Sequence, residues 1–183
     1  MRDVAVLVGS LRRASFNRKM ALALQQVAQG TLALELVEIG ALPLYDEDFE
    51  ADVPSPVTQF RDRLRRAEAV LFVTPEYNRS VPGLLKNAID VGSRPYGKSV
   101  FSLKPAAIVS VSQGVLGAFG ANHHLRQSLV FLDMPTLQQP EMYIGGAAKL
   151  FDQDGRLIND DTRAFLKKFV DAFAGWIEKT RQG

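Results

Sequence analysis

The sequence predicts a doubly wound α/β fold, in which helices cover both faces of a five-stranded parallel sheet with strand order 2-1-3-4-5. Apolar runs that suit strands buried on both faces recur along the chain, and amphipathic helical patterns lie between them. No internal repeat or long linker interrupts this alternation. The whole chain, 1–183, is therefore expected to form one domain.

Continuous rather than alternating apolar stretches mark the central strands. They lie at residues 4–8, 69–73 and 106–111, and such runs are typical of a strand with helices on both sides. The stretch 32–39 predicts a further, partly exposed strand, and 136–137 predicts a short late one. Right-handed crossovers between five strands give the predicted order, whose switch point lies at the carboxyl ends of strands one and three.

Apolar residues at helical spacing indicate three helices. The patterns are Met20, Leu24 and Val27; then Val57, Phe60 and Leu64; and last Phe165, Phe169, Phe173 and Trp176. Ser55 is predicted as the N-cap of the second helix, with Pro56 in its first position, and Thr162 as the N-cap of the third. The aromatic row of the last helix is interpreted as core rather than as a cofactor site, because its spacing is helical.

Composition excludes several kinds of chemistry. The chain has no cysteine, so disulfides, thiolate metal sites and cysteine nucleophiles are excluded, and a redox function needs a bound cofactor. Its 22 basic and 20 acidic residues give no strong field for nucleic acid or a membrane. His123 and His124 lack zinc-ligand spacing, and the acidic run 46–48 lacks a coordinating pattern, so no metal is expected. The short, early-charged start predicts a cytoplasmic protein.

The loop after the first strand carries groups that suit a phosphate. Residues 9–17 include Ser10, Arg12, Ser15 and Asn17, next to the amino end of a helix. Backbone N–H groups and the helix dipole favour an anion there, and an arginine adds a forked donor. The loop lacks the glycine pattern of dinucleotide folds and the lysine motif of triphosphate binders, so a monophosphate suits it better. The alternative is that Ser15 or Asn17 only caps the helix.

Two further loops follow neighbouring strands. Residues 75–83 place prolines on both sides of Tyr77, and a stiff loop of this kind can lay its peptide groups along a flat heterocycle. The alternative is a plain strand-to-helix connection capped by Ser80. Residues 112–120 are rich in glycine, which lets the backbone approach a ligand closely. The predicted sheet brings all three loops to one crevice.

Several motifs together carry a family resemblance. They are Gly9-Ser10-Leu11-Arg12 with Ser15-Phe16-Asn17-Arg18, Thr74-Pro75-Glu76-Tyr77-Asn78-Arg79-Ser80-Val81-Pro82-Gly83, Leu85-Lys86-Asn87-Ala88-Ile89-Asp90, and shorter matches that reach Pro140-Glu141. The sequence thereby resembles the NAD(P)H-dependent FMN reductases, in particular their bacterial chromate and quinone reductase branch, which is flavodoxin-like. The resemblance covers nearly the whole chain.

This resemblance implies FMN as cofactor and assigns its contacts. The FMN phosphate is assigned to Ser10, Arg12, Ser15 and Asn17, the border of the isoalloxazine ring to Pro75, Glu76, Tyr77 and Asn78, and the pyrimidine side to Ser112, Gly114 and Gly117. One position departs from the pattern, because many relatives have a second glycine where this chain has Ala118.

The resemblance also implies an assembly and an activity. A homodimer or homotetramer is expected, with Arg126 and Glu141 near the subunit contacts, although both residues fit an ordinary surface equally well. NADH or NADPH would reduce FMN, which would pass electrons to a second substrate in the same opening. Quinones are the expected acceptors, followed by azo and nitro compounds, free flavin and chromate. No side chain is expected as an obligatory acid or base.

Two alternatives to an enzyme remain open at the level of sequence. The first is a flavodoxin-type electron carrier without nicotinamide oxidase activity, which usually gains from an acidic docking surface. The slightly basic net charge of +2 counts against that alternative. The second is a non-catalytic flavin-dependent interaction module, for which the sequence shows no extra tail.

Overall fold

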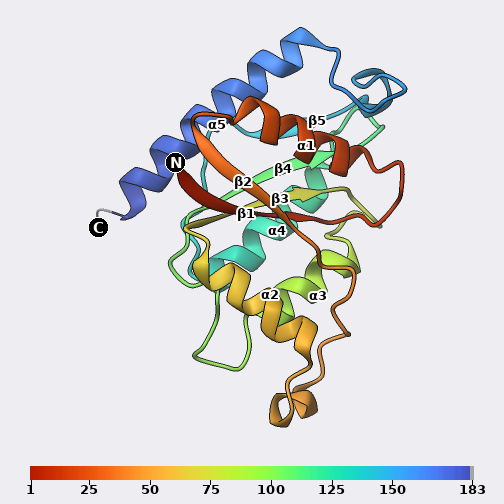
Figure 1. The fold of residues 1–183 in the computed structure, drawn as a ribbon. Helices are drawn as coiled ribbons and strands as arrows, with labels where there is room; N and C mark the ends of the chain where they lie inside the picture. Colours follow the sequence, from red (N-terminus) through yellow and green to blue (C-terminus); the bar gives the residue numbers. More distant parts are fainter. Residues whose placement is uncertain (182–183) are drawn as a thin grey trace.

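The computed structural model describes residues 1–181 and shows a five-stranded parallel sheet between two layers of helices (Figure 1). The strands are β1 (Arg2–Val8), β2 (Leu32–Val37), β3 (Ala69–Thr74), β4 (Ala106–Val111) and β5 (Met142–Ile144). Their spatial order is β2-β1-β3-β4-β5, and every neighbouring pair is parallel. The predicted strand order and fold class are confirmed.

Helices cover both faces of the sheet, as the continuous apolar runs predict. The helices are α1 (Phe16–Val27), α2 (Ser55–Arg66), α3 (Gly83–Gly92), α4 (Phe119–Phe131) and α5 (Asp160–Arg181), with two 3-10 turns, η1 (Glu47–Ala51) and η2 (Ala147–Lys149). Helices α1 and α5 pack on one face, and α2, α3 and α4 pack on the other. Every residue of β3 and β4 is buried, because both faces of these strands are covered.

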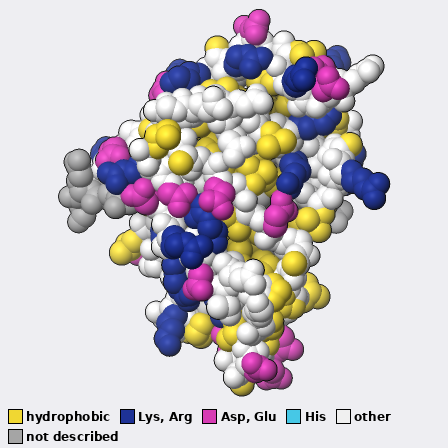
Figure 2. All heavy atoms as spheres, viewed as in Figure 1, with side chains coloured by type: hydrophobic (Ala, Val, Ile, Leu, Met, Phe, Trp, Pro, Cys, Tyr) yellow, Lys and Arg dark blue, Asp and Glu magenta, His cyan; other side chains and the backbone are white. Residues whose placement is uncertain are grey.

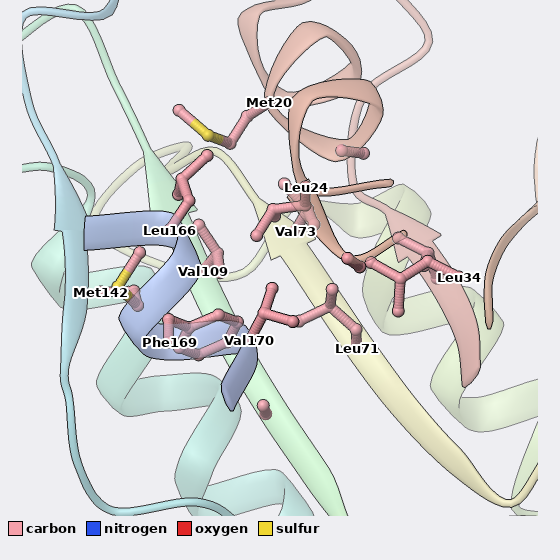
Figure 3. Close-up of a cluster of buried hydrophobic side chains, with 14 of the residues drawn as sticks. Met20, Leu24, Leu34, Leu71, Val73, Val109, Met142, Leu166, Phe169 and Val170 are labelled. Carbon is pink, nitrogen blue, oxygen red and sulfur yellow. The ribbon is translucent and has the colours of Figure 1, made fainter. Parts of the chain in front are cut away.

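The aromatic row of the last helix belongs to the core, as its spacing predicts. Figure 3 shows Phe169 and Val170 of α5 and Leu24 of α1 directed at the side chains of β3 and β4. Phe169 and Phe173 are each 1% exposed. The partly buried Trp176 donates its indole N–H to the carbonyl oxygen of Pro135, at 2.8 Å.

The late strand lies elsewhere than predicted. Residues Met142–Ile144 form β5, whereas Thr136 makes only an isolated bridge to Ala106. Pro135, next to the bridge, has no N–H for a ladder hydrogen bond, and the carbonyl oxygen of Leu137 accepts a hydrogen bond from the side chain of Arg126. The prediction of a strand at 136–137 was wrong.

Two helix caps also differ from the prediction. Helix α5 begins at Asp160, and its first turn is capped by Asn159, whose Oδ1 accepts the N–H of Thr162 at 2.8 Å. Thr162 is thus a residue of the first turn. Helix α2 begins at Ser55, so the cap position falls on Pro54. Propensity places such boundaries only to within a few residues.

Charge is spread evenly over the visible surface. Basic and acidic side chains are interspersed on the face in Figure 2, in keeping with a net charge of only +2. Within residues 1–181, no helix is both long and apolar enough to cross a bilayer.

Candidate functional site

A cleft of about 140 Å³ opens where β1, β3 and β4 end. This edge includes the switch point between β1 and β3, where ligands bind in doubly wound sheets. Eight of the eleven residues that the sequence assigns to a cofactor line the cleft: Ser10, Arg12, Ser15, Asn17, Pro75, Glu76, Tyr77 and Ser112. The three predicted loops do meet in one place.

The other three assigned residues, Asn78, Gly114 and Gly117, lie in the same loops but do not line the cleft. Three further residues line it without having been assigned: Phe16, Val111 and Gln113. In the sequence, Phe16 and Gln113 each lie between two assigned residues, and this position could have indicated that they belong to the site. The Phe16 ring also stacks on Phe151, with centroids 6.3 Å apart, so its apolar character indicates core as much as site.

The first loop forms a cradle at the amino end of α1. Ser15 is the N-cap, and its Oγ accepts the N–H of Arg18 at 3.2 Å, so this residue does cap the helix. No acidic residue lies in the first turn of α1, so no side chain there neutralises the positive end of the helix dipole. Arg12 is exposed and forms no ion pair with any side chain of residues 1–180.

Asn17 brings an unsatisfied acceptor to the cleft wall. Its side chain is 4% exposed, and Nδ2 donates to the carbonyl oxygen of Val111 at 3.3 Å. Its Oδ1 is buried and has no hydrogen-bond partner. A buried acceptor left in this state costs roughly 1–3 kcal/mol. A ligand with a hydroxyl or N–H donor would remove that cost.

The second loop is a two-residue hairpin rather than a plain connection. Tyr77 and Ser80 exchange backbone hydrogen bonds of 3.2 and 2.9 Å, and both residues between them are left-handed, Asn78 at φ 50° and Arg79 at φ 62°. This is the pattern of a type I′ turn, which joins strands tightly. Tyr77 is half exposed beside it. The turn therefore presents an aromatic side chain on a stiff backbone.

Ser80 does not cap the following helix. Pro82 occupies the cap position of α3, without a side-chain hydrogen bond. The Oγ of Ser80 instead forms a 3.0 Å hydrogen bond with Nδ1 of His124, on α4. The capping alternative for Ser80 was wrong because the hairpin turns its side chain toward α4.

Glu76 fastens the hairpin to α4. Its Oε2 accepts the N–H of Ala121 at 3.0 Å, and its Oε1 accepts a weaker bond from Arg79 at 3.3 Å. A Cβ at position 120 would lie 2.9 Å from Oε2, so Gly120 leaves room for the carboxylate. The amino end of α4 partly compensates the charge of Glu76. Its carboxylate is thus occupied in bracing the loop.

The third loop ends in two consecutive left-handed residues, Gly117 at φ 58° and Ala118 at φ 59°. A Cβ on Gly117 would lie 2.5 Å from the carbonyl carbon of Tyr143, so only glycine fits there. Glycine adopts the conformation of Ala118 without strain. The loop therefore adopts a conformation typical of glycine at position 118, although the residue there is alanine.

Polar residues on α4 and β5 lie beyond this loop. Arg126 is half-buried and donates to Oδ1 of Asn122 and to the carbonyl oxygen of Leu137, both at 3.1 Å, so it is more than a solvated surface residue. Burial and a hydrogen bond to Glu141 raise the pKa of Tyr143 to about 12. Whether Arg126 and Glu141 meet another subunit stays a prediction.

Comparison with known sequences gives consistent matches. Residues 2–149 match the family model described as NADPH-dependent FMN reductase. The chain is 66% identical to a quinone reductase of Pseudomonas putida strain KT2440 over 181 residues, which cover 98% of this chain and 96% of that protein. It is 44% identical over 178 residues to a 2-hydroxy-1,4-benzoquinone reductase of a Burkholderia species, covering 97% of each chain.

Solved structures agree with the sequence matches. FerB of Paracoccus denitrificans, a flavoenzyme NAD(P)H:(acceptor) oxidoreductase, superposes with a TM-score of 0.93 at 45% identity over 98% of this chain and 99% of its own. A flavodoxin of Pseudomonas aeruginosa superposes with a TM-score of 0.55 at 17% identity, over 94% of this chain and 99% of its own. That second likeness shows the shared fold alone.

Proposed function

The chain belongs to the NADPH-dependent FMN reductase family, and on that premise we propose that the cleft at the ends of β1, β3 and β4 holds FMN and serves quinone reduction by NAD(P)H. The protein is an oxidoreductase with FMN as its cofactor, and its relatives include enzymes named quinone reductases.

The residues of the cleft fit FMN. Three features suit the phosphate: the amino end of α1, which has no acidic residue in its first turn, the hydroxyls of Ser10 and Ser15, and Arg12, which has no ion-pair partner among the side chains of residues 1–180. The unsatisfied Oδ1 of Asn17 needs a donor, which a hydroxyl of the flavin's ribityl chain would supply. The observation that carries the proposal is that this orphaned acceptor lines the same cleft as Arg12, which forms no ion pair within the described part of the chain. We expect the ring near Tyr77 and the loop 112–117.

The side chains of the cleft orient reactants more than they transfer protons. Bound FMN supplies a centre that accepts a hydride and gives up electrons. Only Arg12, Glu76 and Tyr77 carry ionisable side chains in the lining, and Glu76 is held by α4. Catalysis would therefore rest on positioning and on backbone dipoles, without an obligatory side-chain acid or base. The half-exposed Tyr77 suits stacking on a flat quinone or nicotinamide ring.

Quinones are the proposed acceptors. The relatives named quinone reductase and 2-hydroxy-1,4-benzoquinone reductase support this choice, and the open cleft mouth suits a planar molecule. Azo and nitro compounds, free flavin and chromate are proposed as secondary acceptors, and NADH and NADPH as donors. The family membership and these relatives favour an enzyme over a flavodoxin-type electron carrier.

We also propose a cytoplasmic, single-domain protein that forms a homodimer or homotetramer. Val130 and Phe131 of α4 are 80% and 74% exposed, and Val115 beside the cleft is 93% exposed. Neighbouring exposed apolar side chains such as Val130 and Phe131 suit a subunit contact. Arg126 and Glu141 would lie among the polar groups there. Sedimentation equilibrium of the FMN-loaded protein measures the assembly directly.

An anaerobic spectrum of the FMN-loaded protein tests the proposed function. Addition of NADPH is expected to bleach the flavin absorption, and subsequent benzoquinone is expected to restore it. Bound FMN that neither NADPH nor NADH bleaches would favour the electron carrier. Failure of the purified protein to bind FMN would remove the cleft assignment as well.

A further inference from the structure

A chain of buried polar side chains runs behind the loop 112–117. Ser110 of β4 and Asn122 of α4 are both 0% exposed and lie outside the cleft lining. Arg126 Nε donates to Asn122 Oδ1 at 3.1 Å, and Asn122 Nδ2 donates to Ser110 Oγ at 3.3 Å. Ser110 Oγ donates to the carbonyl oxygen of Gly117 at 2.7 Å. Two fully buried polar side chains thus connect the half-buried Arg126 to the loop 112–117.

The series of hydrogen bonds has one direction, from Arg126 to Gly117. A guanidinium group only donates, so Asn122 must accept through its oxygen and donate through its nitrogen. Ser110 accepts that bond and has a single proton left. The carbonyl oxygen of Met142, at 3.2 Å, is a more distant acceptor for it than that of Gly117. Successive hydrogen bonds polarise one another, and the charge at the head strengthens the last one.

The last bond fixes the orientation of the peptide unit that follows Gly117. The Gly117 carbonyl is held toward the interior, at the start of the left-handed pair Gly117 and Ala118. Without its donor, this peptide unit could turn its oxygen toward the ligand side of the loop. An outward carbonyl would oppose the negative charge of a reduced flavin.

We propose that Ser110 and Asn122 are positioning residues of the flavin site, which hold the Gly117 carbonyl inward with Arg126 at the head of the chain. This inference rests on the proposed placement of FMN beside the loop 112–117. Neither residue touches the cleft, so both act through the backbone of Gly117.

Two variants separate this role from simple packing. Ser110→Ala removes the donor to Gly117. Asn122→Asp keeps the size of the side chain and gains an ion pair with Arg126, but a carboxylate cannot donate to Ser110. The Ser110 proton is then drawn to the carboxylate, and Gly117 loses it. Ser128→Ala is the matched control on α4, because within the described residues the Ser128 hydroxyl bonds only to the carbonyl oxygen of His124.

Three measurements compare these variants with the wild type. Hydrogen exchange of the FMN-free protein is expected to quicken at residues 112–120 in Ser110→Ala and Asn122→Asp, but not in Ser128→Ala. Fluorescence titration is expected to show FMN bound about tenfold more weakly. A further tenfold loss for reduced relative to oxidised FMN would lower the two-electron midpoint potential by about 30 mV.

The outcomes separate this inference from the proposed function. Unchanged exchange, FMN affinity and potential in both variants would overturn the positioning role. Full FMN affinity and potential in Asn122→Asp would likewise show that Asn122 only packs or pairs with Arg126. If one variant melts more than a few degrees below the wild type, the positioning role is judged from the other variant. A wild type that fails to bind FMN contradicts the proposed function, whereas the exchange measurement still tests the hydrogen-bond chain.

Discussion

At the amino ends of the strands, charged side chains are paired with one another, whereas at the carboxyl ends Arg12 has no ion-pair partner among the side chains of residues 1–180. Arg2, the first residue of β1, pairs with Glu68 at 2.9 Å and with Glu178 of α5 at 2.7 Å. The fold itself neutralises this end of the sheet.

A second arginine at the amino ends of the strands is also ion-paired. Arg63 of α2 pairs with Asp3 of β1 at 2.8 Å and with Glu35 of β2 at 2.9 Å. At the cleft, the buried Oδ1 of Asn17 has no partner. The charge of Arg63 is thus neutralised within the fold, although its buried Nε also lacks a hydrogen-bond partner among the described residues. Arg12 and Asn17 at the cleft keep charge and hydrogen-bonding capacity that a ligand can use.

The largest expected difference in stability and FMN binding is between Gly117→Ala, at the carboxyl ends of the strands, and Gly30→Ala, at their amino ends. Both glycines are left-handed, Gly117 at φ 58° and Gly30 at φ 81°. A Cβ added at position 117 would lie 2.5 Å from the carbonyl carbon of Tyr143, whereas one added at position 30 would meet nothing within 4 Å. We expect Gly117→Ala to cost about 3 kcal/mol of stability and to abolish tight FMN binding. Gly30→Ala, between α1 and β2, should cost about 1 kcal/mol with FMN affinity intact. Urea unfolding and FMN titration check both, and equal losses would contradict the close contact at 117.

Asn17→Leu is expected to separate binding from stability. The change removes the buried orphan acceptor together with the 3.3 Å bond to Val111, so the FMN-free protein should keep its stability to within about 1 kcal/mol. FMN should bind about tenfold more weakly, because its hydroxyl loses an acceptor. Thermal melts with and without FMN measure both effects. A large loss of stability without FMN would show that Asn17 serves the fold instead.

Arg63→Met, at the amino ends of the strands, is expected to lower stability slightly without changing FMN binding. Stability at pH 7 should fall by about 1 kcal/mol, since the partners are partly exposed, and FMN affinity should not change. The hydrogen bond from Arg63 lowers the pKa of Glu35. A depressed carboxyl pKa stabilises the fold above the unfolded value of about 4.3 and loses this effect as pH falls below it. The difference between wild type and variant should therefore shrink between about pH 5 and pH 3 in urea unfolding series.

Features of the fold that depend on local pattern were predictable. The central strands and their order follow from continuous apolar runs and crossover handedness. Eight cleft residues lie in the loops predicted at the strand ends, and the family resemblance assigned them individually. The strand at 136–137 was misplaced because two short apolar segments compete, and only tertiary pairing selects Met142–Ile144. Asn159 was missed as a cap because Thr162 fits the same local pattern.

Contacts between distant segments could not be predicted. Nothing near Glu76 in sequence indicates that its carboxylate accepts the N–H of Ala121, 45 residues away. Ser110 stands in an apolar strand, where a lone hydroxyl fits a buried surface without any special role. Its connection to Asn122 appears only when α4 packs on β4. Such bonds depend on the relative placement of whole elements, which periodicity does not specify.

The most direct test of the FMN cleft compares FMN with riboflavin, which lacks the phosphate, in the wild type, Arg12→Ala and the neighbouring control Arg13→Ala. We expect wild type and Arg13→Ala to bind FMN far more tightly than riboflavin. Arg12→Ala should lose roughly 10- to 100-fold in FMN affinity, with little change for riboflavin and no change in melting temperature. The same preference for FMN in Arg12→Ala as in the wild type would contradict the phosphate site at the amino end of α1.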